Sequence, residues 1–405
     1  MKKGWEIKRL SEIGKVYNGN SINEKVKKDN YSDLDDGFPY IATKDISYNS
    51  EINYENGIKI PFSEKNSFKI APKNTVLICA EGGSAGRKIG FTNQEVCFGN
   101  KLFALATKND IESRYVYYYY FSETFQKHFS VELAGIIGGV SMNKFKDLEI
   151  PLPPLPEQQR IVAILDEALA AIAKAKANAE QNLKNSKELF ESYLQGMFEK
   201  KGEDWEDNIL KDVCELKSGT TISPSLERTE GDVLYTKVGD MNLPDNEVEI
   251  NTSSRFVNSR EIKINQIIPQ GAIIFPKRGG AIATNKKRKI IKPTIVDLNT
   301  MAIIPSKKID NDYFFHWFQL FDLNSISNGA NIPQINNYSF DEVYIPYPKS
   351  IREQQLIVQK LNTLSTETKK LETIYQTKIK DLEELKKSVL QKAFSGELKT
   401  AKALV

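Results

Sequence analysis

The sequence contains few of the residues on which metal, disulfide and histidine chemistry depend. Three cysteines and two histidines occur among 405 residues. Cys79, Cys97 and Cys214 are odd in number and form no Cys-x-x-Cys pair. This spacing argues against a zinc site and against the disulfide framework of a secreted domain. A reducing cytosol is the expected environment.

Long apolar runs and an excess of one charge are also missing. No run of about 18 apolar residues occurs, and the two lysines in the opening MKKGWEIKRL are not followed by the apolar core of a signal peptide. We therefore expect neither export nor membrane insertion, and predict a cytoplasmic protein. The formal net charge is only +3. An anionic partner would have to be bound by local basic loops, because no strong overall positive field exists.

Motifs of several enzyme classes are absent or incomplete. Gly82 to Gly86 fits the Gly-x-Ser-x-Gly nucleophile elbow, but His128 and His316, the only histidine bases available, both lie in or beside aromatic runs. The same segment does not fit a phosphate-binding P-loop. No Asn-Pro-Pro-Tyr or Asp-Pro-Pro-Tyr segment of an amino-methyltransferase occurs. We expect no catalytic residue, metal site or cofactor in this chain.

The run Tyr117 to Tyr120 is interpreted as a helix face packed on a domain core, although such tyrosines could also stack on unpaired bases.

A tandem repeat is the main positive feature of the chain. LPPLPEQQRIV begins at Leu152 and YPKSIREQQLIV at Tyr347, and their glutamates Glu157 and Glu353 are 196 residues apart. Matching segments also begin at Trp5 and Trp205, and each half has an apolar run followed by a glycine pair. A fixed offset of this kind indicates duplicated structural units. Each unit would begin with a mixed α/β domain of about 145 to 150 residues, a normal domain size.

The period of the apolar pattern changes after each proline-rich junction. Apolar residues then recur at alternating steps of four and three, which is typical of a coiled-coil seam. Proline fixes its own backbone and extends the residue before it, so it separates a sheet domain from a helix. The predicted seam comprises Ile161, Leu165, Ala168, Ile172, Ile357, Leu361, Leu364, Leu371, Leu382, Leu385 and Val389.

These patterns predict an α+β fold with two homologous mixed α/β domains separated by two long helices. The expected boundaries are 1–152 for the first domain, 153–201 for the first helical region, 202–348 for the second domain, 349–396 for the second helical region and 397–405 for a C-terminal tail. Since a whole domain separates the helices, the second can return antiparallel to the first, with the domains at opposite ends of a coiled coil on the order of 60 Å long. Such a bar can measure distance along duplex DNA, but the same design serves coiled-coil adaptors whose heads bind proteins.

The junction motifs resemble a known family. IPLPPLPEQQRIVAILD, its partial copy IPYPKSIREQQLIVQKL and the ending LKKSVLQKAFSGEL are similar to the specificity subunit of type I restriction-modification systems. The resemblance covers nearly the whole chain. The second copy departs from the pattern at Ser350, Ile351 and Arg352, which predicts a looser junction there.

The resemblance implies a non-catalytic DNA-binding subunit. Each domain would be a target-recognition domain that reads one half of a split DNA sequence, and the helices would set the gap and dock methyltransferase subunits, one for each half. S-adenosylmethionine is expected in the partner methyltransferase and not in this chain. Whether a restriction motor subunit also joins is left open.

Candidate DNA contacts follow from residue chemistry. Glycine-rich turns let the backbone approach phosphate and nearby Lys and Arg neutralise it, whereas base choice needs groups such as Arg for guanine and Asn or Gln for adenine. The candidates are Lys44, Arg87, Lys88, Ser141, Asn143 and Lys144 in the first half and Lys237, Lys277, Arg278, Lys286, Lys287, Arg288, Gln334 and Asn336 in the second. Any single lysine could instead be a solvated surface residue.

Two other functions remain: a protein-binding adaptor, which would show no DNA sequence preference, and an autonomous methyltransferase or nuclease, which would need a cofactor pocket.

Overall fold

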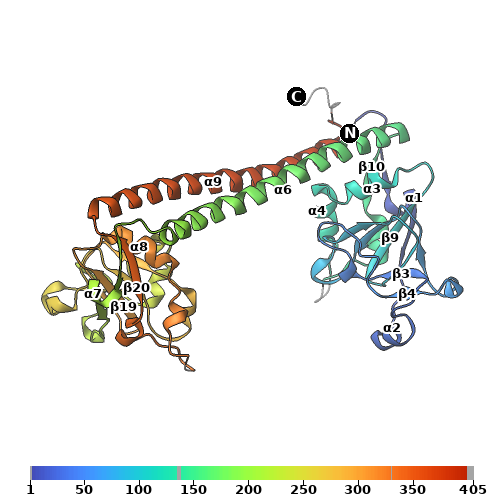
Figure 1. The fold of residues 1–405 in the computed structure, drawn as a ribbon. Helices are drawn as coiled ribbons and strands as arrows, with labels where there is room; N and C mark the ends of the chain where they lie inside the picture. Colours follow the sequence, from blue (N-terminus) through green and yellow to red (C-terminus); the bar gives the residue numbers. More distant parts are fainter. Residues whose placement is uncertain (1, 135–137, 330, 399–405) are drawn as a thin grey trace. The chain divides into compact units, whose positions relative to one another are not determined.

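The computed structural model describes residues 2–134, 138–329 and 331–398 (Figure 1). The chain divides into two compact units: unit 1 comprises Met1–Glu180 and Gln376–Val405, and unit 2 comprises Gln181–Tyr375. Each unit holds one α/β domain and parts of two long helices. Both long helices are divided between the two units. Of the expected tail 397–405, residues 399–405 lie outside the described residues.

The first domain, in unit 1, is built on small sheets. An antiparallel sheet has the order β2-β9-β6-β7, and a mixed sheet has the order β4-β3-β8-β5, in which β3 and β8 are parallel. β1 pairs antiparallel with β10, which brings the first strand beside the strand that precedes the long helix. The strands are β1 Glu6–Arg9, β2 Gly14–Asn18, β3 Phe38–Ile41, β4 Lys59–Ile60, β5 Ile70–Ala71, β6 Val76–Cys79, β7 Ile89–Phe91, β8 Val96–Phe98, β9 Leu102–Thr107 and β10 Glu149–Leu152.

Short helices complete the first domain: α1 Leu10–Ile13, α2 Glu24–Asn30, α3 Ser113–Tyr119, α4 Glu123–Val131 and α5 Met142–Asp147. Of the tyrosine run, Tyr117 to Tyr119 lie on α3 and Tyr120 caps it. Tyr119 and Tyr120 are fully buried in the core, as the sequence predicted, and so is Tyr115 on the same helix. The Tyr115 hydroxyl donates to the Pro151 carbonyl at 2.6 Å, which ties the core to the strand before the long helix.

The second domain, in unit 2, repeats this plan. Its sheets have the orders β12-β19-β16-β17-β14, β15-β13-β18 and β11-β20. The strands are β11 Trp205–Ile209, β12 Cys214–Ser218, β13 Val233–Thr236, β14 Glu249–Ile250, β15 Phe256–Val257, β16 Ile273–Pro276, β17 Arg288–Ile290, β18 Thr294–Val296, β19 Thr300–Pro305 and β20 Tyr344–Pro348, and the α-helices are α7 Leu210–Val213 and α8 Asn311–Leu320. α8 corresponds to α3, since the Tyr313 hydroxyl donates to the Pro346 carbonyl at 2.8 Å. The predicted duplication is therefore present in the fold.

Two 45-residue helices, α6 Leu155–Glu199 and α9 Ile351–Ser395, pack antiparallel within each unit (Figure 1). In unit 1, Lys176 pairs with Glu383 at 2.7 Å, and Arg160 donates to the Leu398 carbonyl at 3.2 Å. In unit 2, Leu194 and Phe198 of α6 share a core with Ile357 and Leu361 of α9. No helix in the described part of the chain has an apolar stretch suited to crossing a membrane.

The apolar seam differs in part from its prediction. Leu371 is 37% exposed and Leu385 is 48% exposed, so both assignments were wrong. After the buried Thr368, the inward-facing stripe advances by four residues and not three. Because each residue turns an α-helix by about 100°, Leu371, one position before the half-buried Glu372, points outward. Of the remaining predicted positions, Ile161, Leu165, Ile172, Ile357 and Leu361 are buried and Ala168, Leu364, Leu382 and Val389 are half-buried.

The repeated Glu-Gln-Gln motif joins each domain to its helix. The buried Gln158 side chain accepts from the Glu112 amide at 2.9 Å and donates to the Pro153 carbonyl at 2.8 Å. Its counterpart Gln354 accepts from the Asp310 amide at 2.7 Å and donates to the carbonyls of Pro348 and Lys308 at 2.8 and 3.0 Å. Each glutamine satisfies main-chain groups that burial would otherwise leave unpaired. Ser350 to Arg352 predicted a looser second junction. The hydrogen bonds do not show one, because Gln354 forms three at the second junction and Gln158 forms two at the first.

Candidate nucleic-acid interface

Three loops of the first domain lie side by side. We name them the β3 loop (residues 42–50), the β6 loop (residues 80–88) and the α5 loop (residues 138–144). The β6 and α5 loops are joined by hydrogen bonds from the Gly82 amide to the Gly138 carbonyl at 2.7 Å and from the Val140 amide to the Ala80 carbonyl at 3.0 Å. Lys88 joins the β6 and β3 loops by donating to the Thr43 carbonyl at 3.0 Å. The candidate residues of the first half are thus gathered on neighbouring loops.

A glycine is required at one turn of the β6 loop. Gly86 has φ +72, in the left-handed region that L side chains rarely adopt. A Cβ at this position would also lie 2.7 Å from the Phe129 ring of α4. The turn therefore fixes where the following residues, Arg87 and Lys88, leave the domain.

The polar candidates of the first domain have different local roles. Lys44 and Arg87 are exposed, Lys88 is half-buried, and none of them forms an ion pair within the described residues. Lys144 is exposed but pairs with Glu132 at 2.7 Å. Ser141 caps α5 by accepting from the Lys144 amide, and Asn143 is exposed in the first turn. The positive charge left without a carboxylate therefore lies mainly on the β3 and β6 loops.

The second domain repeats the same loop arrangement. We name its loops the β13 loop (residues 237–246), the β16 loop (residues 277–287) and the η11 loop (residues 331–339), the last after the 3₁₀-helix η11, Asn337–Phe340. The Gly279 amide donates to the Pro333 carbonyl at 2.7 Å, and the Ile335 amide donates to the Lys277 carbonyl at 2.9 Å. These bonds correspond to those between the β6 and α5 loops. The α5 loop and the η11 loop therefore occupy equivalent places in the two domains.

The side chains of the second domain form more internal contacts. Lys237 pairs with Glu227 at 3.1 Å, and Lys286 donates to the Asn242 side chain. Lys277 donates to the Ser218 hydroxyl at 3.0 Å, and burial followed by the nearby Arg278 charge lowers the Lys277 pKa. Arg278 itself is exposed.

An amide chain lies beside these basic residues. Gln334 donates to the Asn336 side-chain carbonyl at 3.0 Å, and Asn336 donates to the Tyr338 hydroxyl at 2.9 Å. Each amide still has unused hydrogen-bonding capacity, because an amide offers two donors and an acceptor. The η11 loop therefore presents groups suited to base edges.

Lys287 and Arg288 differ from the other candidates. Lys287 is 1% exposed and donates to the Asn285 side chain at 2.9 Å and to the Phe321 carbonyl, and burial lowers its pKa to about 8. Arg288 donates to the Met241 carbonyl at 3.1 Å and to the Lys287 carbonyl at 2.9 Å. Both side chains connect parts of the domain interior, and the burial of Lys287 argues against a direct DNA contact.

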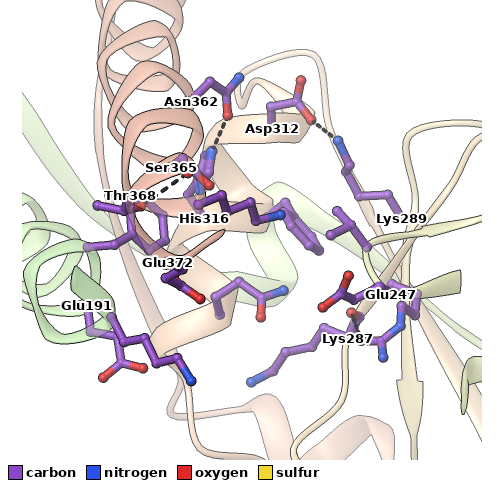
Figure 2. A pocket seen from close by; sticks show the side chains of 17 residues that line it. Glu191, Glu247, Lys287, Lys289, Asp312, His316, Asn362, Ser365, Thr368 and Glu372 are labelled. Carbon is purple, nitrogen blue, oxygen red and sulfur yellow. Dashed lines mark hydrogen bonds and ion pairs between the residues drawn. The ribbon is translucent and has the colours of Figure 1, made fainter. Parts of the chain in front are cut away.

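Both residues also line a cavity of about 470 Å³ in unit 2, between the second domain and the helices (Figure 2). Its walls carry the bonded pairs His316–Asn362, at 2.9 Å, and Lys289–Asp312, at 3.0 Å. Carboxylates and basic groups alternate around it, so the lining does not favour an anionic ligand over a cationic one.

The enzyme-like patterns have structural explanations. The Ser84 hydroxyl of the Gly-x-Ser-x-Gly segment shares a 3.2 Å hydrogen bond with the Tyr48 hydroxyl, so its partner is not a histidine. His316 is buried, and burial lowers its pKa, as expected for a core histidine. Among the described residues, no group of three or more His, Cys, Asp or Glu side chains is arranged to hold a metal ion.

Two exposed tyrosines were missed by the sequence reasoning. Tyr48 in the β3 loop is 61% exposed, and Tyr338 in the η11 loop is 64% exposed. Each is a single aromatic residue in a turn rich in Ser and Asn, with the local sequences SYNS and NNYS. This isolation is the signal that could have found them, because large aromatic side chains are usually buried.

Comparisons with known proteins identify the family and the fold. Residues 2–184 and 202–381 match the family described as the type I restriction modification DNA specificity domain. The chain is 24% identical to the type I restriction enzyme MjaIX specificity subunit of Methanocaldococcus jannaschii, covering 98% of this chain and 94% of that protein. It is 23% identical to the EcoKI specificity subunit of Escherichia coli, covering 98% and 89%.

Two solved structures share the fold. One, from a study of complex assembly and conformational transition of the type I R-M system, has a TM-score of 0.77 at 17% identity and covers 98% of this chain and 99% of the other. The HsdS subunit from Thermoanaerobacter tengcongensis has a TM-score of 0.65 at 17% identity and covers 98% of each chain. The chain therefore belongs to the DNA specificity subunits of type I restriction-modification systems, a non-catalytic family whose members recognise bipartite DNA targets.

Proposed function

We propose that the β3, β6 and α5 loops of the first domain bind one half of a bipartite duplex target, and that the β13, β16 and η11 loops of the second domain bind the other half. The observation that carries this proposal is the repeated loop pairing, which places glycine turns, basic side chains and hydrogen-bonding groups together in both domains. Backbone amides and basic groups position phosphates, and the amide side chains can read base edges.

The long helices supply the second part of the proposal. Their packed seam sets the unread gap between the half-sites, and their outer surfaces dock methyltransferase subunits, one for each half of the repeat. S-adenosylmethionine belongs to those partners, and a restriction motor subunit can join them. Since the ligand is genomic DNA, we place the complex in the cytoplasm.

Selection from random duplex DNA tests the specificity. The full chain, co-purified with its candidate methyltransferase subunit, should enrich two short constant blocks separated by a fixed unread gap. The selection must be carried out at a salt concentration at which ordinary phosphate contacts persist, because those contacts weaken steeply with salt. Enrichment of no sequence under these conditions would favour a protein-binding adaptor.

An insertion tests the role of the helices. Adding one helical turn, about four residues, to both α6 and α9 should lengthen the preferred gap and leave both half-sites unchanged. Seven residues in each helix would preserve the heptad register and should lengthen the gap further. An unchanged gap in both variants would contradict the measuring role of the helices.

A further inference from the structure

Tyr48 is the single aromatic residue in the β3, β6 and α5 loops of the first domain. Its side chain is 61% exposed, although burial of an aromatic ring normally stabilises a fold by removing apolar surface from water. The proposed function rests on charged and amide groups and leaves this ring without a role.

The loop that carries Tyr48 is well ordered by its own hydrogen bonds. A bridge between Ile46 and Ile52 closes the loop. The Ser47 amide donates to the Glu51 carbonyl at 2.9 Å, and the Ser47 hydroxyl accepts from the Glu51 amide at 3.1 Å. Fixing the loop in advance lowers the conformational entropy that is lost when a ligand binds. Tyr48 is therefore presented on a formed turn.

The surroundings of Tyr48 combine an apolar ring with positive charge. The guanidinium carbon of Arg87 lies 5.7 Å from the ring centroid, and the Lys88 ammonium lies 5.3 Å from it. Both distances are within the range of cation–π attraction. Since neither cation forms an ion pair within the described residues, their charge remains available to an anion.

The Tyr48 hydroxyl is already engaged. It shares a hydrogen bond with the Ser84 hydroxyl at 3.2 Å, which links the β3 loop to the β6 loop. The carbon face and edge of the ring are therefore the parts most suited to a new contact. In duplex DNA, an apolar group at a groove edge contacts the thymine methyl group, while neighbouring basic side chains contact phosphate.

We propose that Tyr48 is a specificity-determining residue for the half-site read by the first domain. Its ring contacts a base edge through carbon, most favourably the methyl group of a thymine, and Arg87 and Lys88 neutralise the flanking phosphates. This inference rests on the proposed function. The repeat places Leu243 at the corresponding position of the second domain, so an aromatic contact from this position is particular to one half-site.

Selection from random duplex DNA with the full chain and its methyltransferase partner tests the proposal. Tyr48→Ala should reduce discrimination by about tenfold at one base pair of one half-site, and leave the other half-site and the gap unchanged. Tyr48→Phe keeps the ring and removes only the bond to Ser84, so it should preserve that base preference. Phe62→Ala is the matched control, because Phe62 is 58% exposed in the same domain but lies outside the three loops.

The outcomes separate this inference from the proposed function. If the wild-type chain selects a split motif and Tyr48→Ala keeps every base preference, the inference is overturned, whether or not the affinity falls uniformly. If the wild-type chain selects no split motif, the proposed function fails and the role of Tyr48 fails with it. Thermal unfolding of Tyr48→Ala should match that of the wild type, since the ring is exposed; altered unfolding together with a loss at both half-sites would indicate a structural role and would also overturn the inference.

Discussion

The loop surfaces of the two domains share a backbone plan but differ in their polar chemistry. In the first domain, Arg87 and Lys88 lie over the Tyr48 ring without an ion-pair partner in the described residues. In the second domain, Lys237 pairs with Glu227, Lys286 is held by Asn242, and the amide chain from Gln334 to Tyr338 lies in the equivalent later loop. Basic side chains without a carboxylate partner thus occur on both surfaces, whereas the amide chain is a feature of the second. Two domains with the same backbone plan can therefore present different side chains on equivalent loops.

The junctions between domain and helix show the same division between fixed position and variable chemistry. In unit 1, the Tyr118 hydroxyl donates to the Asp166 carboxylate, which also pairs with Arg114 at 2.7 Å. In unit 2, the corresponding contact joins His316 to Asn362 at 2.9 Å. An ionic contact in one unit is replaced by a contact without a carboxylate in the other. The location of the contact is kept by the repeat, whereas its charge is not.

The largest expected effect tests whether the two seams are equivalent. Leu165→Ala in unit 1 and Leu361→Ala in unit 2 each remove a fully buried side chain, so each should lower the free energy of unfolding by about 2 to 5 kcal/mol. Urea unfolding, followed by a probe in each unit, would measure both losses. Leu385→Ala is the control and should cost less than about 1 kcal/mol, because Leu385 is 48% exposed. A loss from Leu385→Ala as large as that from Leu361→Ala would contradict the corrected seam.

A pH dependence should distinguish unit 2 from unit 1. Burial lowers the pKa of Lys287 from 10.5 to about 8, so between these pH values the unfolded chain binds more protons at this residue than the folded chain. The contribution of Lys287 to stability should therefore rise with pH across this window, by up to about 3 kcal/mol, and should be absent in Lys287→Met. Urea unfolding at pH 8 and pH 10 would measure the difference. A slope in Lys287→Met equal to that of the wild type would show that other groups cause it.

Replacing the buried glutamines should have a smaller effect on stability and compares the two junctions. Gln158→Met and Gln354→Met keep most of the side-chain volume but leave main-chain groups unpaired, so each variant should lower the free energy of unfolding by about 1 to 3 kcal/mol. Gln354 satisfies three such groups and Gln158 two, so the variant in unit 2 should be the less stable. Hydrogen exchange at the Glu112 and Asp310 amides should accelerate in the respective variants. Gln195→Met, on an exposed part of α6, should change neither amide.

The smallest expected effect concerns DNA binding by the exposed charges. Arg87→Ala should reduce the slope of log affinity against log salt concentration by about 1, because one phosphate contact is lost. Lys287→Met should leave that slope unchanged, since Lys287 is buried. Lys174→Ala, on an exposed position of α6, serves as a surface control. A larger change of slope in Lys287→Met than in Arg87→Ala would reverse the assignment of contacts.

The features predicted well from the sequence were those that repeat or that span many residues. The offset between Glu157 and Glu353 identified the duplication, and the long periodic runs identified both helices. The interpretation of Tyr117 to Tyr120 as a core-facing helix was also confirmed for its buried members, because an aromatic run at helical spacing has few other favourable environments.

The errors arose where one residue's direction decides the outcome. Leu371 fits a heptad pattern, but a step of four from Thr368 to the half-buried Glu372 turns it outward, and no local residue signals that step. Leu385 is also exposed, although Leu382 keeps its predicted half-buried position. Lys287 belongs to a basic cluster in the sequence, yet its ammonium is bonded inside the domain. The role proposed for Tyr48 depends on the fold bringing Ser84, Arg87 and Lys88 to its ring, across a sequence separation that periodicity does not reveal.

The bonds made by Gln158 and Gln354 have a consequence for how such a chain can change. Both side chains bind only main-chain amides and carbonyls of the domain they hold, and these groups are present whatever the side chains are. A joint of this kind is insensitive to most substitutions in the domain, provided that the local backbone turn is kept. An entire domain could therefore be exchanged for another of the same backbone plan without altering the helices, and new specificity could be acquired by recombination.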